Sequence, residues 1–355
     1  MPSSAPDRSV LVPLEIDPST PPAGSRLHTL GGRTMGTDWS ARFAVPPGFA
    51  AAAGVQAHLQ AELDAVNAQM SHWDDTSLLA RYNRAPGGTW IDLPPQFFDV
   101  MAYALDVAEG SAGAYDPAAG ALVNLWGFGP TRRYDQAGFY APAADAIARV
   151  QAQRAAAAPR LDRAGRRLYQ PGGAVLDLSS VAKGYAVDRL ALCLTGRGLA
   201  HHVVEVGGEL RGAGVKPDGQ PWWVEVEGVP DAPDAAPPAQ APVIALHGLA
   251  IATSGDYRRY FQHPQGRRAS HTLDPRSGWP IANDVASVTV LAPTCMAADA
   301  LSTALTVLGP QAGLAFAIER TLPARFLLRR QGDREGGQDG GLREVCSPAW
   351  TALLQ

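Results

Sequence analysis

The chain has 355 residues, of which 46% are apolar, and its formal net charge is −4. This length and apolar share allow one large domain or two closely joined domains with a well-packed core. The slightly acidic balance gives no support for binding to nucleic acid or to an anionic membrane surface.

The N-terminal residues 1–28 predict a flexible arm, because the segment up to residue 25 is rich in proline and serine. It shows neither a basic start followed by an apolar run nor a lipid-acceptor cysteine. We find no run approaching the roughly 20 apolar residues that span a bilayer. We therefore expect no transmembrane segment and a cytoplasmic protein. Cys193, Cys295 and Cys346 have the spacing of neither a zinc site nor a disulfide framework, and the first two are expected in the core.

The first half of the chain predicts one strand followed by helices. The strand is expected around 33–43. Helical periodicity covers 50–70 and 95–110, and the second of these begins with a proline. The alanine-rich segment 142–158 predicts a further helix on the outside of the fold.

The second half predicts short strands separated by turn signals, together with two helices. The helices are expected at 295–308 and 310–320, and residues 228–242 and 332–341 are expected to be loops. The predicted strands are 202–206, 209–215, 222–227, 243–254, 286–291 and 324–329. Runs of strands interrupted by a few long helices indicate an α+β fold.

The segment LDLSSVAKGYAVD, residues 176–188, is the most informative in the chain. We expect a buried strand at 174–178, a helix N-cap at the two serines and a helix over 181–194. Asp177, free helix amides and Lys183 would then form a polar site that favours an anion, with Asp177 tolerated if a cation or a donor-rich ligand intervenes. This predicts a phosphate with a metal, or a nucleotide. The alternative is an ordinary connection with a solvated aspartate and lysine.

Asp299 and Thr303 lie four residues apart on a predicted helix and therefore share one face. Their neighbours are small or apolar, so burying them requires a partner. Hard oxygen ligands of this kind suit Mg²⁺. The alternative is that Asp299 only caps the first turn of the helix.

Three further segments combine polar residues with turn residues. SHTLDPRSG, residues 270–278, is typical of a hairpin, and its His271 is the histidine best placed to act as a general base. GAYDP at 113–117 and NLWGFG at 124–129 place aromatic rings beside glycines, which suits contact with a planar ligand but also an ordinary loop. TSGDY at 253–257 resembles a ligand-facing turn.

Taken together and in this order, these segments resemble the ApbE family, the FAD:protein FMN transferases. The resemblance covers roughly residues 30 to 320. It also includes Met35-Gly36-Thr37, Met70-Ser71, Asn83 and Gly207-Gly208-Glu209. It implies a single α+β unit, T-fold-like, with antiparallel sheets, packed helices and a flavin cleft. The transferase domain would span 29–330 with a surface insertion at 228–242, followed by a loop and C-terminal segment at 331–355.

The resemblance implies an enzyme that binds FAD and Mg²⁺, cleaves the pyrophosphate and releases AMP. FMN would be attached by a phosphodiester bond to a threonine or serine of an acceptor protein, such as a subunit of a membrane redox complex. The implied FAD contacts are Met35, Trp73, Ala114, Tyr115, Asp116, Asp177, Lys183 and Thr272. The implied Mg²⁺ ligands are Asp299 and Thr303, with Ser302 nearby and the backbone carbonyl of Ser180. His271 is the proposed base, and Asp274 would replace it or orient it.

Two other functions are compatible with the same residues. An FAD pyrophosphatase would use water in place of the acceptor hydroxyl, giving FMN and AMP. A flavin-binding protein would hold FAD without turnover.

Overall fold

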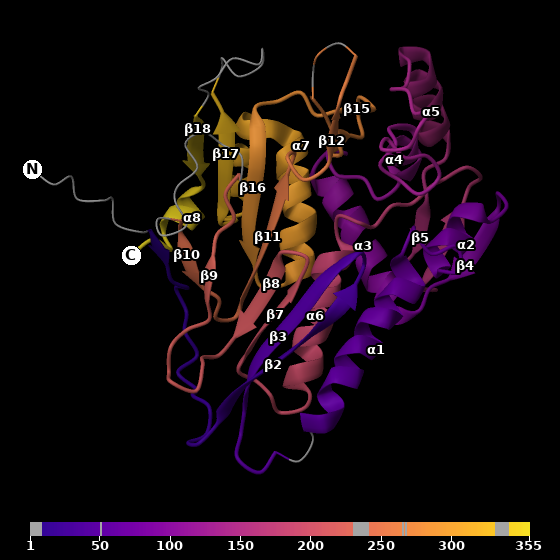
Figure 1. Ribbon diagram of the computed structural model, residues 1–355. Coiled ribbons are helices and arrows are strands. Elements are labelled where there is room, and N and C mark those ends of the chain that lie inside the picture. The colour runs from indigo at the N-terminus through magenta and orange to yellow at the C-terminus, as the bar shows by residue number, and fades with distance from the viewer. Residues whose placement is uncertain (1–8, 50–51, 230–240, 265, 267, 331–340) are drawn as a thin grey trace, which may run out of the picture.

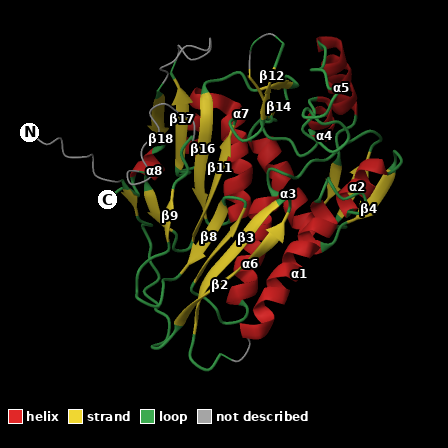
Figure 2. Cartoon of the chain, in the orientation of Figure 1, coloured by secondary structure: helices red, strands yellow, loops and turns green. Residues whose placement is uncertain are grey.

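The computed structural model describes residues 9–49, 52–229, 241–264, 266, 268–330 and 341–355. The first eight residues of the predicted arm, most of the 228–242 insertion and nearly all of the 332–341 loop lie outside these ranges. Within them, helices and antiparallel strands combine in one α+β arrangement, which confirms the expected fold class (Figure 2).

An eight-stranded antiparallel sheet forms the centre of the molecule (Figure 1). Its order is β18-β17-β16-β11-β8-β7-β3-β2. In the same order the strands are Leu342–Cys346, Ala324–Arg329, Val285–Ala292, Leu249–Gly255, Glu209–Ala213, His202–Val206, Thr37–Val45 and Arg26–Thr34. Every residue of β16 is buried, as its run of small and β-branched side chains predicts for a strand covered on both faces.

Four long helices pack together against one face of the sheet. They are α1 (Ala52–Met70), α3 (Pro95–Gly110), α6 (Ala182–Thr195) and α7 (Cys295–Glu319). Alternate strand residues reach this core: Ala250 and Ala252 of β11 do so, while Ile251 faces the opposite side. The helices predicted at 50–70 and 95–110 are thereby confirmed.

The remaining elements are short, and most of them had no counterpart in the sequence prediction. Among the described residues, two three-stranded sheets and two two-stranded sheets accompany the large sheet: β1-β10-β9, β4-β6-β5, β12-β13 and β14-β15. Their bounds are β1 Val10–Leu11, β4 Thr89–Asp92, β5 Arg160–Asp162, β6 Arg167–Gln170, β9 Trp223–Glu225, β10 Val243–Ala245, β12 Tyr260–Gln262, β13 Arg268–Ser270, β14 Leu273–Asp274 and β15 Trp279–Pro280. The short helices are α2 (Leu78–Arg84), α4 (Gly120–Leu125), α5 (Ala144–Ala156) and α8 (Pro348–Thr351).

Helix α7 is kinked at Gly309, whose φ of 79° and ψ of 179° leave the helical region just before Pro310. The two helices predicted on either side of this point are confirmed. By length and composition α7 is apolar enough to cross a membrane, contrary to our expectation that no run is long enough. It packs instead against β11, β16 and α6, as the core helix of this fold.

Segment 174–178 is not a strand, so that prediction is wrong. Its backbone pairs with a side chain and a loop: Leu176 donates its N–H to Asn83, and Asp177 donates to the carbonyl of Pro117. Neither serine caps α6, whose N-cap position is Val181 and has no side-chain hydrogen bond. The sequence prediction missed that Asn83, which is distant in the sequence, hydrogen-bonds to the backbone of Leu176 in place of a neighbouring strand.

Two strand predictions also need correction. The single strand expected around 33–43 is a hairpin of β2 and β3 joined at Met35-Gly36. The strand expected over 243–254 is divided into β10 and β11, with Gly248 at a φ of 72° between them. Each break falls at a glycine that adopts a left-handed conformation.

The first and the last described segments of the chain both belong to the fold. Val10–Leu11 pairs with β10, and Leu11 is fully buried with Trp222 and Trp350 on the sheet face opposite the long helices. Strand β18 is an edge strand of the large sheet. Part of the predicted flexible arm is therefore ordered, because Val10–Leu11 pairs with β10. Residue 330 is not a domain boundary, because β18 belongs to the large sheet.

Candidate functional site

One cavity of about 950 Å³ gathers nearly all the segments that the sequence singled out. Its volume suits a ligand larger than a typical drug molecule. Most of the predicted site residues line it: Met35, Trp73, Ala114, Tyr115, Asp116, Asp177, Ser180, Lys183, His271, Thr272, Asp299 and Thr303. Asp274 and Ser302 do not line it.

Met35 enters the cavity wall from the β2–β3 turn. Met35 has a φ of 49° and Gly36 a φ of 73°, so both residues of this two-residue turn are left-handed. A methionine in that region is strained, and such strain is often retained at functional sites. Trp73 is half exposed, with the Arg133 guanidinium 5.9 Å from its ring centroid, and its face is available for stacking.

Asp177 forms a polar cluster with His72 and Ser179. Its Oδ1 accepts from the backbone N–H of Ser179 at 2.8 Å and from the Ser179 hydroxyl at 2.6 Å, and it lies 3.3 Å from His72 Nδ1. Burial works to raise the pKa of Asp177, but His72 and Ser179 outweigh it, and the pKa falls well below its usual range. Asp177 is therefore ionised, and it accepts from His72 and Ser179, whereas we had expected a cation or a donor-rich ligand to compensate its charge.

A second charged cluster lies at the base of α6. Lys183 is paired with Glu209, which is buried at the start of β8. Burial raises the pKa of Glu209 to about 7 in spite of Lys183. Burial alone would lower the pKa of Lys183, but Glu209 and Asp299 together raise it. The lysine is thus held as a cation between two carboxyl groups.

Asp299 on α7 is buried against the first turn of α6. Its Oδ2 accepts from the backbone N–H of Gly184 at 2.9 Å. Gly184 lets the two helices approach closely, because a Cβ there would lie 2.8 Å from the Cβ of Asp299. Burial raises the pKa of Asp299, with Lys183 opposing the rise. A further cation at this carboxyl would favour its ionised form.

The oxygen atoms around Asp299 suit a hard cation. The Thr303 hydroxyl lies 3.0 Å from that of Ser254, and both residues line the cavity. Among the described residues there is no cluster of three His, Cys, Asp or Glu side chains, which excludes a typical zinc site there. One carboxylate with hydroxyl and backbone oxygens matches Mg²⁺, which takes its other ligands from water and phosphate. Ser302 is fully buried, and its hydroxyl donates to the backbone carbonyl of Asp299 at 2.9 Å. This hydrogen bond stabilises the helix turn that carries Asp299.

His271 follows β13 and is oriented by backbone. Its Nδ1 lies 3.1 Å from the carbonyl of Arg259 and donates to it in the neutral ring, which leaves Nε2 unprotonated. Burial lowers the pKa of His271 to about 4. The imidazole is therefore neutral at physiological pH and competent to accept a proton. The neighbouring Thr272 is buried in the cavity wall.

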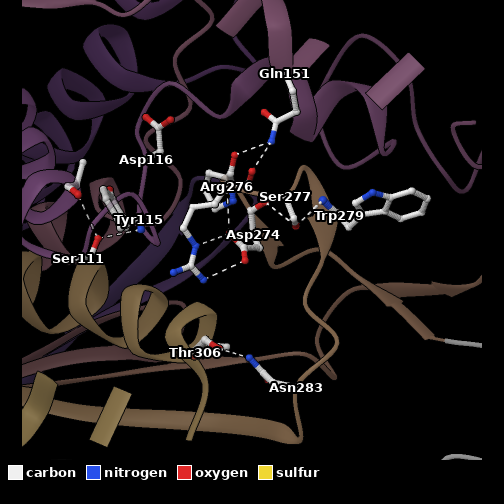
Figure 3. Close-up of polar contacts among 12 residues, drawn as sticks. Ser111, Tyr115, Asp116, Gln151, Asp274, Arg276, Ser277, Trp279, Asn283 and Thr306 are labelled. Atoms are coloured by element: carbon white, nitrogen blue, oxygen red, sulfur yellow. Dashed lines mark hydrogen bonds and ion pairs between the residues drawn. The ribbon is translucent and has the colours of Figure 1, made fainter. Parts of the chain in front are cut away.

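Asp274 does not orient His271. It makes a two-pronged ion pair with Arg276, at 2.9 and 3.0 Å (Figure 3). This pair shapes the turn between β14 and β15, which Gln151 of α5 holds through the carbonyls of Pro275 and Arg276. The predicted catalytic role of Asp274 has no support in this geometry, because the nearby arginine competes for its carboxylate.

Tyr115 and Asp116 shape the opposite wall. Asp116 is paired with Arg154 at 2.5 Å, and Arg154 also donates to the Pro275 carbonyl at 2.8 Å. This arginine ties the 114–116 loop to the 274–278 turn. Tyr115 is almost fully buried, and burial raises the pKa of its hydroxyl well above the usual range. The Ser180 side chain is a polar neighbour of this hydroxyl and works against the rise in its pKa.

Sequence reasoning missed four ionisable residues of the cavity: His72, Glu227, Arg258 and Arg259. Glu227 accepts from Tyr257 at 2.7 Å and from Arg258 at 2.5 Å. A signal existed for three of them, since Arg258 and Arg259 follow TSGDY directly and His72 lies between Ser71 and Trp73. Glu227 ends a weak strand and carried no motif.

Comparisons with known proteins agree with this geometry. The ApbE family model matches residues 35–326. The FAD:protein FMN transferase of Klebsiella pneumoniae is 35% identical over 95% of this chain and 93% of its own, and that of Haemophilus influenzae is 35% identical over 86% and 87%.

Solved structures agree as well. The apo form of the flavinyl transferase ApbE of Pseudomonas stutzeri has a TM-score of 0.80 at 34% identity, covering 93% of this chain and 97% of its own. The flavin transferase ApbE of Vibrio cholerae has a TM-score of 0.80 at 33% identity, covering 93% and 100%. The chain therefore belongs to the ApbE family of flavin transferases.

Proposed function

We propose that the protein is an FAD:protein FMN transferase that uses Mg²⁺ to cleave FAD, releases AMP and leaves FMN on a threonine or serine of an acceptor protein through a phosphodiester bond. The observation that carries the proposal is the presence, in one cavity, of a buried carboxylate with hydroxyl oxygens and of an unprotonated histidine.

Asp299, Thr303 and the Ser180 carbonyl would hold Mg²⁺. The ion would neutralise charge on the pyrophosphate and stabilise the departing AMP. Gly184 fixes the Asp299 carboxylate from the other side with its N–H. Lys183 adds positive charge next to this site and remains protonated because Glu209 is beside it.

His271 would act as the base. Its Nε2 takes the proton from the acceptor hydroxyl while the hydroxyl oxygen forms a bond to the phosphorus of the FMN half. The bond from that phosphorus to the bridging oxygen breaks, and the electron pair leaves with AMP. The Arg259 carbonyl keeps the imidazole in the required tautomer.

The other cavity residues would bind FAD. Met35 and Trp73 offer apolar and aromatic surface, and Ala114, Tyr115 and Asp116 form the opposite wall. Asp177 and Thr272 complete the set between these walls. Asp116 is held in place by Arg154 and is a positioned acceptor.

The experiment incubates the protein with FAD, Mg²⁺ and a candidate acceptor and separates the small-molecule products. AMP released in proportion to acceptor, without free FMN, supports transfer. Equal amounts of free FMN and AMP without labelled acceptor indicate FAD hydrolysis, and unchanged FAD indicates a flavin-binding protein.

We further propose that the acceptor is a subunit of a membrane redox complex. Comparing flavin-labelled proteins in the host with and without this gene identifies it, and a soluble acceptor would contradict the proposal. The cytoplasmic location expected from the sequence stays a prediction, which cell fractionation tests.

A further inference from the structure

His72 is a cavity residue that the mechanism above does not use. It lies in the loop between α1 and α2, with its side chain 12% exposed. Its Nδ1 is paired with Asp177, but its Nε2 is buried and has no hydrogen-bond partner in the described part of the chain. A buried polar atom without a partner is unusual in a folded protein and requires an explanation.

The same condition recurs around this cavity. Among the described residues, Glu209 Oε2 is a second buried side-chain atom without a partner, beside His72 Nε2. Both residues line the cavity. Since an unsatisfied polar group is costly inside a protein, their gathering at one cavity indicates that a ligand supplies the missing partners.

The surroundings of His72 decide what its Nε2 offers. The charged groups that face the imidazole are Asp177, at 3.3 Å, and Arg259 across the cavity wall. Burial and Arg259 work to lower the pKa of His72, but Asp177 outweighs them and raises it. The ring is therefore held as an imidazolium at mildly acid pH, and Nε2 carries a hydrogen.

Asp177 offers the complementary atom. The contacts of its carboxylate with His72 and Ser179, as the described residues show them, all go to Oδ1. Oδ2 is left for a ligand. A donor on His72 and an acceptor on Asp177 thus belong to two residues that both line the cavity.

We propose that His72 is a substrate-binding residue, whose Nε2–H donates to an acceptor on a ring edge of FAD while Asp177 Oδ2 is free to accept from another donor of the same ligand. This inference rests on the proposed function, since it takes FAD as the occupant of the cavity. FAD presents two such edges: the amino group beside a ring nitrogen of adenine, and the ring N–H beside a carbonyl of the flavin. Trp73, whose ring centroid lies 5.1 Å from that of His72, is half exposed beside this site.

The test measures the affinity for FAD through the change in flavin fluorescence on binding. Mg²⁺ is left out, so the measurement does not depend on turnover. His72→Ala is expected to weaken binding about tenfold or more near pH 6, the value of a hydrogen bond from a charged donor. His72→Gln keeps a neutral donor and should recover part of the loss. His58→Ala, which alters an exposed histidine of α1 away from the cavity, is the matched control and should bind FAD like the wild type.

The pH dependence separates a donor from a space-filling ring. Wild-type affinity should fall as the pH rises above the pKa of His72, because Nε2 then loses its hydrogen, whereas His72→Gln should lack this dependence. Equal FAD affinity for the wild type and a folded His72→Ala, with the same pH dependence, would overturn the proposal. If the wild type itself fails to bind FAD, the proposed function fails first.

Two smaller probes identify the ring edge. If His72 contacts adenine, His72→Ala weakens the binding of ADP and leaves the binding of FMN unchanged. If His72 contacts the flavin, His72→Ala weakens the binding of FMN and leaves that of ADP unchanged. Both results support the role of His72. Unchanged binding of both probes, measured at concentrations at which the wild type binds them, contradicts it.

Discussion

Asp299 is a residue whose burial has opposite consequences for stability and for activity. Burial raises its pKa, so folding makes the ionisation of this carboxyl less favourable. A group with a raised folded-state pKa contributes stability at low pH and loses it as the pH rises through that pKa. Without a metal, ionised Asp299 therefore destabilises the protein at neutral pH.

The substitution Asp299→Asn tests this directly. Metal-free Asp299→Asn should melt at the same or a higher temperature than the wild type near neutral pH, because asparagine imitates the neutral carboxyl and can still accept from Gly184. Its transfer activity should fall about 10²–10³-fold, and its melting temperature should no longer rise with Mg²⁺. Asp145→Asn, in an exposed pair with Arg149, is the control. A Mg²⁺-stabilised Asp299→Asn would refute the ligand assignment.

His271 is expected to titrate far from an ordinary histidine. Burial lowers its pKa to about 4, so its imidazole signals in the NMR spectrum of the free enzyme should shift near that pH. The missing signal of His271→Asn identifies the resonance. A midpoint close to the ordinary histidine value, about 6.5, would show that the ring is solvated instead.

The same His271→Asn variant tests the base. Asparagine keeps a donor for the Arg259 carbonyl but cannot take a proton, so transfer should fall about 10²–10⁴-fold. FAD affinity should remain nearly unchanged. Unaltered transfer rates would remove His271 from the mechanism.

At the scale of elements, the contact between α6 and α7 positions both Lys183 and Asp299. Gly184 lies at this crossing. An added Cβ would clash there, because it would overlap the Cys295 carbonyl oxygen and lie 2.8 Å from the Cβ of Asp299. Gly184→Ala should therefore destabilise the protein by about 1–3 kcal/mol and weaken Mg²⁺ stabilisation. Gly54→Ala, in helix α1 with only ordinary contacts, should be neutral or stabilising. Chemical denaturation measures both, and a fully stable, metal-responsive Gly184→Ala would contradict this packing.

The elements that the sequence predicted well are those with their own periodicity. Helix α3 begins at the expected Pro95, and β7 and β17 have the expected bounds. Strands β5 and β6 were missed because such short strands depend on pairing with distant segments. Segment 174–178 has a strand-like composition, but Asn83, far away in the sequence, takes its backbone hydrogen bonds.

At the scale of the whole molecule, both chain ends cover the sheet face opposite the long helices. Trp350 of α8 is fully buried there with Leu11 and Trp222. Trp350→Ala should cost about 3–5 kcal/mol of unfolding free energy, measured by chemical denaturation. Trp223→Ala, at a half-exposed neighbour on β9, should cost much less. Equal effects would contradict the assignment of the C-terminal segment to the fold.

The candidate site was more predictable than the fold around it. Asp177, Lys183, His271 and Asp299 were recognised because each is an unusual polar residue in a short motif, whereas Met35 was implied by the family resemblance; one cavity contains them all. His72 and Glu227 were missed because their importance lies in partners far along the chain. Asp274 was overestimated because the sequence does not show that Arg276 takes its carboxylate.

The central claim is that this cavity transfers FMN to a protein hydroxyl. Tandem mass spectrometry of an acceptor incubated with the enzyme, FAD and Mg²⁺ tests it most directly. We predict FMN linked through its phosphate to one threonine or serine, dependent on Mg²⁺ and absent with Asp299→Asn. An acceptor that stays unmodified while FAD is converted to free FMN and AMP would contradict the account.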